Sequence, residues 1–186
     1  SFEADMLVAV DRRGKSISHV WDGGPDKIGY HLGGFSAVSS ALRGFMQDDV
    51  WALSMDRGNA SSAKVYRIAA RPVISKGRYV GAVVHGQSFD SEFAGRLAKR
   101  LGARVIFFRG QVVIASEGPP NETTLVSDQV AAAPLGELLA NEQFLESGQS
   151  GVIELQGNAL GVYSLVMGEA ARVEGSQVGY AVVRPV

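Results

Sequence analysis

The second half of this chain repeats the pattern of its first half. Arg13-Gly14-Lys15 lies between two apolar runs, and Arg109-Gly110-Gln111 occupies the same place 96 residues later. A Val-Gly pair inside an apolar stretch recurs in the same way, as Val80-Gly81 and then as Val178-Gly179. A nearly constant offset of this kind is typical of a duplicated structural unit. The sequence therefore predicts two small units of roughly 90 residues each, a size at which domains still fold.

Composition excludes several classes of protein. The net charge is −1 and no basic stripe with interleaved aromatics is present, so we expect no nucleic-acid partner. The chain has no cysteine, which excludes disulfides, thiolate metal sites and a cysteine nucleophile, and which suits a bacterial exterior. No run approaches the roughly 18 apolar residues that a membrane span needs. The given sequence contains no stretch with a signal-peptide pattern, and we expect both ends to be cut from a longer protein.

Each half shows two strands, a helical connection and then three strands. The strands expected in the first half are 6–10, 15–20, 50–55, 64–74 and 78–86, with a helix at 35–46. The strands expected in the second half are 104–108, 111–116, 152–155, 160–167 and 177–183, with helical stretches over 126–144. This order predicts an α+β fold in which each unit is a five-stranded antiparallel sheet flanked by helices.

The segment 88–102 has the strongest helical pattern. Ser88 or Asp90 can cap its start, and Gly102 can supply the left-handed residue at its end. Its apolar residues recur every four positions, at Phe89, Phe93, Leu97 and Leu101. We expect this helix to lead the second unit, which divides the chain into domains 1–87 and 88–186. The corresponding lead helix of the first unit falls before Ser1, so we expect it to be trimmed or supplied upstream.

The segment from Tyr66 to Ser116 carries a family resemblance. Arg71-Pro72-Val73, Val80-Gly81, Gly86 and Phe89 match a strand ending in Pro-Val, a Val-Gly strand and a following helix, and the opening VAVDRRGKSI matches an Asp-x-x-Gly hairpin. The chain thereby resembles the extracytoplasmic double-Cache sensor domains of bacterial transmembrane receptors. The resemblance implies two tandem PAS-like (Cache) modules outside the membrane, attached through flanking helices to a chemoreceptor, sensor kinase or cyclase. The aromatic-Arg-Trp-Tyr signature of amino-acid-binding members is absent, so no amino-acid ligand is carried over.

A binding site for a small molecule is expected in the first unit. Arg67 and Arg71 have the same parity on one strand, so both side chains leave the same face. Arg67 lies within an apolar strand, and a buried charge needs a partner. That partner is either a ligand carboxylate held by two hydrogen bonds or a salt bridge to Asp49, Asp56 or Glu92.

Four further residues complete the expected site. Trp51 and Tyr66 are expected to wall it, with core packing as the alternative, and Tyr79 and His85 are expected to line it from the neighbouring strand. In the second unit Tyr163 and Arg172 hold similar places among more uniformly apolar strands. The three histidines, His19, His31 and His85, lack ligand spacing, and we expect neither a metal nor another cofactor.

Three functions remain open at this stage. The first is a small-molecule sensor domain, in which the ligand favours one packing of sheet against helices. The second is a module without a ligand, which forms homodimers or binds a partner protein. The third is an enzyme, which the sequence disfavours because no nucleophile, base and orienting group come together in a motif such as Gly-x-Ser-x-Gly.

Overall fold

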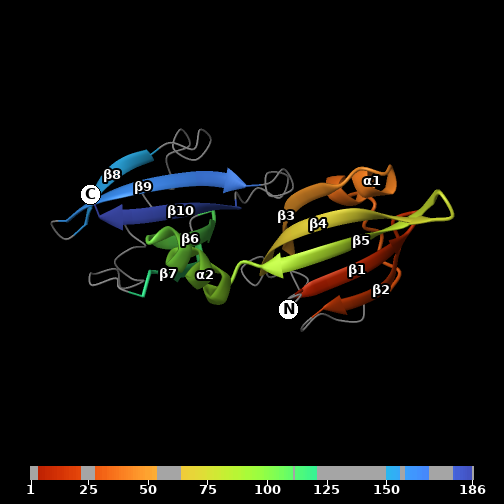
Figure 1. Cartoon of the computed structure of the whole chain (residues 1–186), viewed down its shortest axis with the longest axis horizontal. Coiled ribbons are helices and arrows are strands. Elements are labelled where there is room, and N and C mark those ends of the chain that lie inside the picture. The colour runs from red at the N-terminus through yellow and green to blue at the C-terminus, as the bar shows by residue number, and fades with distance from the viewer. Residues whose placement is uncertain are drawn as a thin grey trace. The chain divides into compact units, whose positions relative to one another are not determined.

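The computed structural model describes residues 4–21, 28–53, 64–110, 112–120, 150–155, 158–167 and 178–185. These residues divide into two compact units, with the boundary between Ser88 and Phe89. Each unit contains one antiparallel sheet and one helix among its described residues, as Figure 1 shows. The α+β class expected from the sequence is confirmed. The helical stretch expected at 126–144 lies outside the described residues.

The first unit is a five-stranded antiparallel sheet with strand order β2-β1-β5-β4-β3. Its strands are β1 (Met6–Asp11), β2 (Ser16–Trp21), β3 (Gln47–Leu53), β4 (Lys64–Ser75) and β5 (Arg78–Ser88). The helix α1 (Ser36–Leu42) packs against β3, β4 and β5. Small buried side chains of α1, Ala37, Val38 and Ala41, let the helix approach the sheet closely. They join Met6, Val8, Trp51, Tyr66 and Ile68 in one apolar core.

The second sheet has the order β7-β6-β10-β9-β8, which is the order of the first sheet when each is counted from its own first strand. Its strands are β6 (Arg104–Arg109), β7 (Val112–Glu117), β8 (Ser150–Leu155), β9 (Asn158–Met167) and β10 (Val178–Pro185). Both opening hairpins carry a bulge, between Ala9 and Val10 in β1 and between Phe107 and Phe108 in β6. The two bulges align the strands residue by residue, so Ala9 corresponds to Phe107.

The helix α2 (Ser91–Leu101) begins at Asp90, whose side chain accepts a hydrogen bond from the Phe93 backbone N–H. Of the two caps considered, Asp90 is therefore the correct one. Ser88 instead donates its N–H and its hydroxyl to Asp5, at 2.6 and 2.8 Å, and closes the end of the first sheet. Gly102 ends the helix at φ 62°, as expected.

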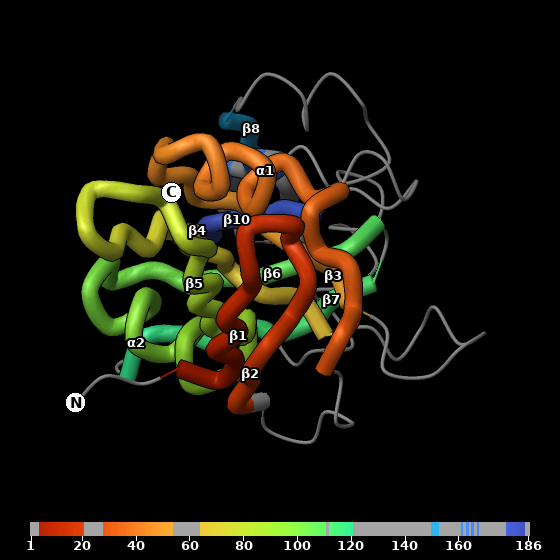
Figure 2. Tube along the Cα trace, turned by 90° about the vertical axis from the view of Figure 1, so that its right-hand side faces the viewer, coloured from red at the N-terminus to blue at the C-terminus, as the bar shows by residue number. Residues whose placement is uncertain are grey.

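The two helices lie on non-equivalent faces of their sheets. When the two sheets are compared strand by strand, α2 covers the face that α1 leaves uncovered. In the first unit, the α1 side of β1 is formed by Met6, Val8 and Val10, which alternate with Ala9. In the second unit, the rings of Phe89 and Phe93 pack on Phe107, the residue that corresponds to Ala9. Figure 2 shows α1 in orange and α2 in green in a second view; α1 contacts β3, β4 and β5, and α2 contacts β6 and β7. The α1 side of the first sheet is also the side on which the first unit has a cavity.

Candidate functional site

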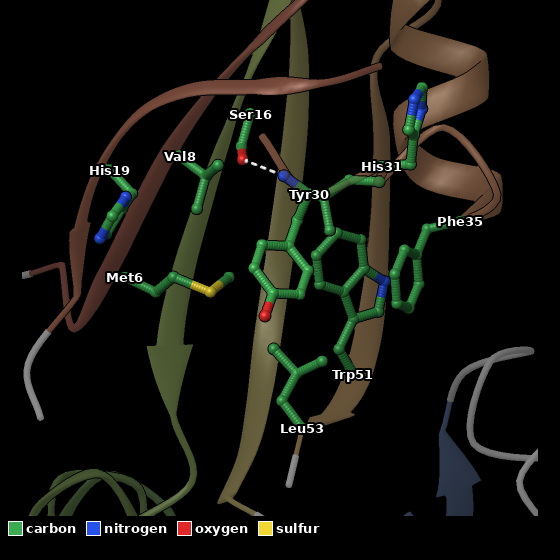
Figure 3. Close-up of a pocket in the computed structure, with 10 residues that line it drawn as sticks. Met6, Val8, Ser16, His19, Tyr30, His31, Phe35, Trp51 and Leu53 are labelled. Atoms are coloured by element: carbon green, nitrogen blue, oxygen red, sulfur yellow. Dashed lines mark hydrogen bonds between the residues drawn. The ribbon is translucent and has the colours of Figure 1, made fainter. Parts of the chain in front are cut away.

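The first unit contains a cavity of about 210 Å³ on the α1 side of its sheet. It lies over β1, β2 and β3 and beneath the segment that leads into α1, as Figure 3 shows. The residues that line it are Met6, Val8, Ser16, His19, Tyr30, His31, Leu32, Phe35, Trp51 and Leu53. We call this cavity the first-unit pocket.

Backbone hydrogen bonds fix the segment that covers the pocket. The Ser16 N–H donates to the Tyr30 carbonyl at 2.9 Å, and the Tyr30 N–H donates to the Ser16 hydroxyl at 3.0 Å. The Leu32 N–H donates to the Gly14 carbonyl at 2.7 Å, and the backbones of His31 and Lys15 form an isolated antiparallel β-bridge. The segment therefore extends the edge of the sheet at β2, which places Tyr30 over the pocket although its side chain is 46% exposed.

Trp51 forms the wall of the pocket on the β3 side. Its indole N–H donates to the Asp49 carboxylate at 3.1 Å, and its ring packs on Phe35 with centroids 4.3 Å apart. Asp49 is only 8% exposed and also accepts from the Val50 N–H at 2.8 Å. A buried carboxylate with several donors holds an indole in one orientation, so this wall is preformed.

The polar side chains of the described lining are one hydroxyl, one phenol and two imidazoles. Ser16, His19, Tyr30 and His31 provide them, and the Nδ1 atom of His19 is buried. Within the described lining there is no carboxylate, ammonium or guanidinium group. An apolar pocket with a few fixed polar groups is the usual form of a small-molecule site.

Two of the expected site residues lie on the pocket side of the sheet. Trp51 lines the pocket, and Tyr66 is its direct partner across the β3–β4 ladder. Tyr66 is buried in the core and is not part of the lining. The sequence left pocket lining and core packing as alternatives for both residues. In the structure Trp51 lines the pocket and Tyr66 packs in the core.

Arg67, Arg71 and His85 lie on the opposite face. Tyr66 and Ile68 face the core, so the alternation of β4 turns Arg67 and Arg71 away from it. His85 pairs with Ala69, which shares that outer face. The expectation that Arg67 is buried is wrong, because its side chain is exposed to solvent and pays no desolvation penalty.

The described residues that were considered as partners for Arg67 have partners of their own, and so has the neighbouring Arg71. Arg71 forms a salt bridge with Asp48 at 2.8 Å and donates to the Gln47 carbonyl at 3.2 Å. Asp49 binds Trp51 on the pocket side, and Glu92 pairs with Arg96 at 2.7 Å. Asp56 lies outside the described residues.

Tyr79 is also separate from the pocket. It lies near the turn between β4 and β5, is 44% exposed, and has its ring against Gly44. The structure therefore places Trp51 alone of the six expected residues in the lining.

Sequence reasoning missed most of the pocket. The sequence places Met6 and Val8 only in an apolar strand, and His19 and His31 were considered only as metal ligands. A signal for them exists, because Val8 and His19 face each other across the β1–β2 ladder and share a face with Met6. The glycine-rich stretch 22–34 has the composition of a loop, and this composition gives no signal that Tyr30 lines a pocket.

The second unit brings two tyrosines together. The rings of Tyr163 and Tyr180 lie with centroids 6.3 Å apart on the α2 side of the sheet. Burial raises the pKa of Tyr180, and the neighbouring Tyr163 adds to this effect. Arg172 lies outside the described residues.

The sequence matches one protein-family model over residues 1–183, the dCache_3 family, described as "Double sensory domain of two-component sensor kinase". The chain belongs to this double-Cache family and is a sensory domain for signal transduction. The Cache-type α+β fold expected from the sequence resemblance is thereby confirmed. No curated protein matches the sequence.

Solved structures resemble the chain more distantly. An extracellular ligand binding receptor from Desulfohalobium retbaense is 15% identical, with TM-score 0.48 over 97% of this chain and 30% of its own. The ligand-binding domain of the Campylobacter jejuni chemoreceptor Tlp3, in complex with 4-methylisoleucine, is 10% identical, with TM-score 0.44 over 98% of this chain and 65% of its own. The V. cholerae histidine kinase DctB sensor domain is 17% identical, with TM-score 0.49 over 98% and 72%. All three scores are below 0.5, so the family match alone carries the assignment.

No helix in the described part of the chain combines the length and the hydropathy of a membrane span.

Proposed function

We propose that this chain is the extracytoplasmic input domain of a bacterial transmembrane receptor and that it binds a small molecule in the first-unit pocket. The receptor is of the sensor kinase or chemoreceptor type. The family match supports the sensory role. The observation that carries the binding role is the cavity of about 210 Å³, with its apolar walls and its few polar groups. The proposal assigns binding, and no catalytic step, to this site.

We further propose that the two units are two PAS-like modules in series, covering 1–87 and 88–186. The shared strand order of the two sheets supports this, as do the matching bulges in their first hairpins. The α2 helix leads the second module in this scheme. Flanking helices outside the present sequence would connect the modules to the membrane.

The pocket suggests how binding becomes a signal. The covering segment is bonded to β2 on one side and leads directly into α1 on the other. A ligand that contacts Tyr30, Phe35 and Trp51 together would favour one packing of α1 on the sheet. The shift it causes is limited by its preference for that packing over the alternatives.

A thermal-shift screen of small metabolites tests the binding role. A molecule that binds only the native state stabilises it by about 2.7 kcal/mol at a hundredfold excess over its Kd. For a chain of this size that corresponds to a rise in Tm of roughly 5 °C or more. The ligand-free alternative, a dimerisation or partner-binding module, predicts no such rise with any small molecule.

A matched pair of variants locates the binding site. Leu53→Phe fills part of the pocket, since Leu53 lines it. Leu101→Phe makes the same change at the end of α2, where the leucine is 57% exposed. The proposal predicts that a hit stabilises the Leu101→Phe variant like the parent and the Leu53→Phe variant much less. Equal stabilisation of both variants would place the ligand elsewhere.

A further inference from the structure

We propose that the ligand of the first-unit pocket is a neutral aromatic molecule, one ring or two fused rings carrying one hydrogen-bonding group. This inference rests on the proposed function and narrows it to a ligand class. It replaces the carboxylate that Arg67 was expected to hold, because Arg67 lies on the other face of the sheet.

The volume of the pocket sets the size of the ligand. An apolar cavity of about 150 Å³ is large enough to bind benzene. The first-unit pocket, at about 210 Å³, exceeds that by the space of a few further heavy atoms. A substituted single ring or an indole fits such a space, whereas a nucleotide or a disaccharide is too large.

The walls of the pocket favour a flat, polarisable molecule. Three of them are the rings of Tyr30, Phe35 and Trp51. Figure 3 shows the Tyr30 ring between Met6 and Trp51, with the Met6 thioether turned toward it. Aromatic rings pack on one another edge to face or offset, and a thioether sulfur also contacts ring edges favourably. An aliphatic ligand of equal volume makes neither kind of contact.

The charge of the lining disfavours an ionised ligand. A carboxylate or an ammonium group transferred into this pocket would lose part of its hydration and meet no ammonium, guanidinium or carboxylate group among the described lining residues. A single hydroxyl or N–H group loses much less hydration free energy, because it carries no net charge. One neutral polar substituent is therefore what the lining accommodates.

Titration calorimetry of the 186-residue chain at pH 8 tests this ligand class. The probes are phenol, indole, cyclohexanol, benzoate and L-phenylalanine. We expect phenol or indole to bind at least tenfold more tightly than benzoate and L-phenylalanine, and at least fivefold more tightly than cyclohexanol. Tighter binding of benzoate or L-phenylalanine would overturn the neutral character, and equal binding of cyclohexanol would overturn the aromatic character.

Two variants distinguish failure of this inference from failure of the proposed function. Tyr30→Ala removes a half-exposed ring from the lining, and Phe45→Ala removes a 65%-exposed ring from the same unit outside it. We expect Tyr30→Ala to weaken binding of phenol or indole at least tenfold, and Phe45→Ala to change it less than twofold. If a charged probe binds and Tyr30→Ala weakens it, the pocket is a binding site and only the ligand class is wrong. If binding of every probe is unchanged by Tyr30→Ala, both the ligand class and the pocket are wrong.

Discussion

The ring of Phe35 packs on the indole of Trp51 with centroids 4.3 Å apart and planes inclined by 32°. This contact joins the residue just before α1 to the middle of β3, across the edge of the first-unit pocket. One ring belongs to the covering segment and the other to the sheet, so the pair joins these two parts of the pocket wall.

Replacing Phe35 by alanine should destabilise the first unit. The change removes a half-buried ring from Trp51, and we expect it to lower the free energy of unfolding by about 2 kcal/mol. Phe45→Ala, at a 65%-exposed ring shortly after the end of α1 in the sequence, should change the free energy of unfolding by less than about 0.5 kcal/mol. Denaturant unfolding followed by tryptophan fluorescence measures both. Equal effects of the two changes would mean that the Phe35–Trp51 contact contributes nothing.

Substitutions of the neighbouring residues Asp48 and Asp49 should lower the free energy of unfolding by very different amounts. Asp49 is buried and accepts hydrogen bonds from the Val50 N–H and the Trp51 indole, so Asp49→Ala leaves two donors without an acceptor. We expect this change to cost about 2–3 kcal/mol of unfolding free energy. Asp48→Ala breaks an exposed salt bridge to Arg71 and should cost less than about 1 kcal/mol. Asp49→Asn keeps an oxygen acceptor and should cost less than Asp49→Ala; a ranking with Asp48 first would refute the account.

Asp11 should contribute to the acid sensitivity of the first hairpin. Its carboxylate accepts from the Lys15 N–H at 2.9 Å and from the Arg13 N–H at 2.8 Å, and these bonds hold its pKa below the ordinary value of 3.8. A lowered native pKa stabilises the fold above pH 3.8, and this contribution is lost as the pH falls below that value through the native pKa. In Asp11→Asn the acid slope of unfolding free energy between pH 5 and pH 2 should therefore be shallower. An unchanged slope in urea unfolding across that range would contradict the assignment.

The glycine of each repeated Val-Gly pair occupies a position with no room for a side chain, and this can be tested in both units. A Cβ at Gly81 would meet the carbonyl of Val10, and a Cβ at Gly179 would meet the ring of Phe108 and the carbonyl of Leu165. We expect Gly81→Ala and Gly179→Ala each to cost about 1–3 kcal/mol of stability. Gly34→Ala is the control, because nothing lies within 4 Å of a Cβ there. Chemical denaturation of all three variants should separate the first two from the third.

The repeated pattern to which the Val-Gly pairs belong made much of the fold predictable from the sequence. These glycine-containing patterns recur at a nearly fixed offset, so the succession of strands along the chain was accessible from the printed residues. The 88–102 helix was accessible from its own four-residue apolar spacing. The helix start was ambiguous because Ser88 and Asp90 are both good caps, and only the tertiary contact of Ser88 with Asp5 resolves it.

The site was less accessible for a physical reason. The alternation of β4 gives Arg67 and Arg71 a common face, but it does not say which face meets a helix. The choice depends on whether the helix lies on the Met6 side, as α1 does, or on the side that α2 takes in the second unit. The position of Tyr30 depends on backbone hydrogen bonds from an irregular segment to Ser16 and Gly14, which carry no sequence pattern.

The most direct test of the central claim is an NMR titration of the labelled chain with the tightest ligand from the screen. The Trp51 indole N–H, held by Asp49 at 3.1 Å, reports on the pocket wall, and the backbone amides of 30–35 report on the covering segment. We predict that these resonances shift most and saturate together at the ligand Kd. Shifts that gather instead around Arg67 and Arg71, or around Tyr163 and Tyr180, with the Trp51 indole unmoved, would contradict the claim that the first-unit pocket is the sensor site.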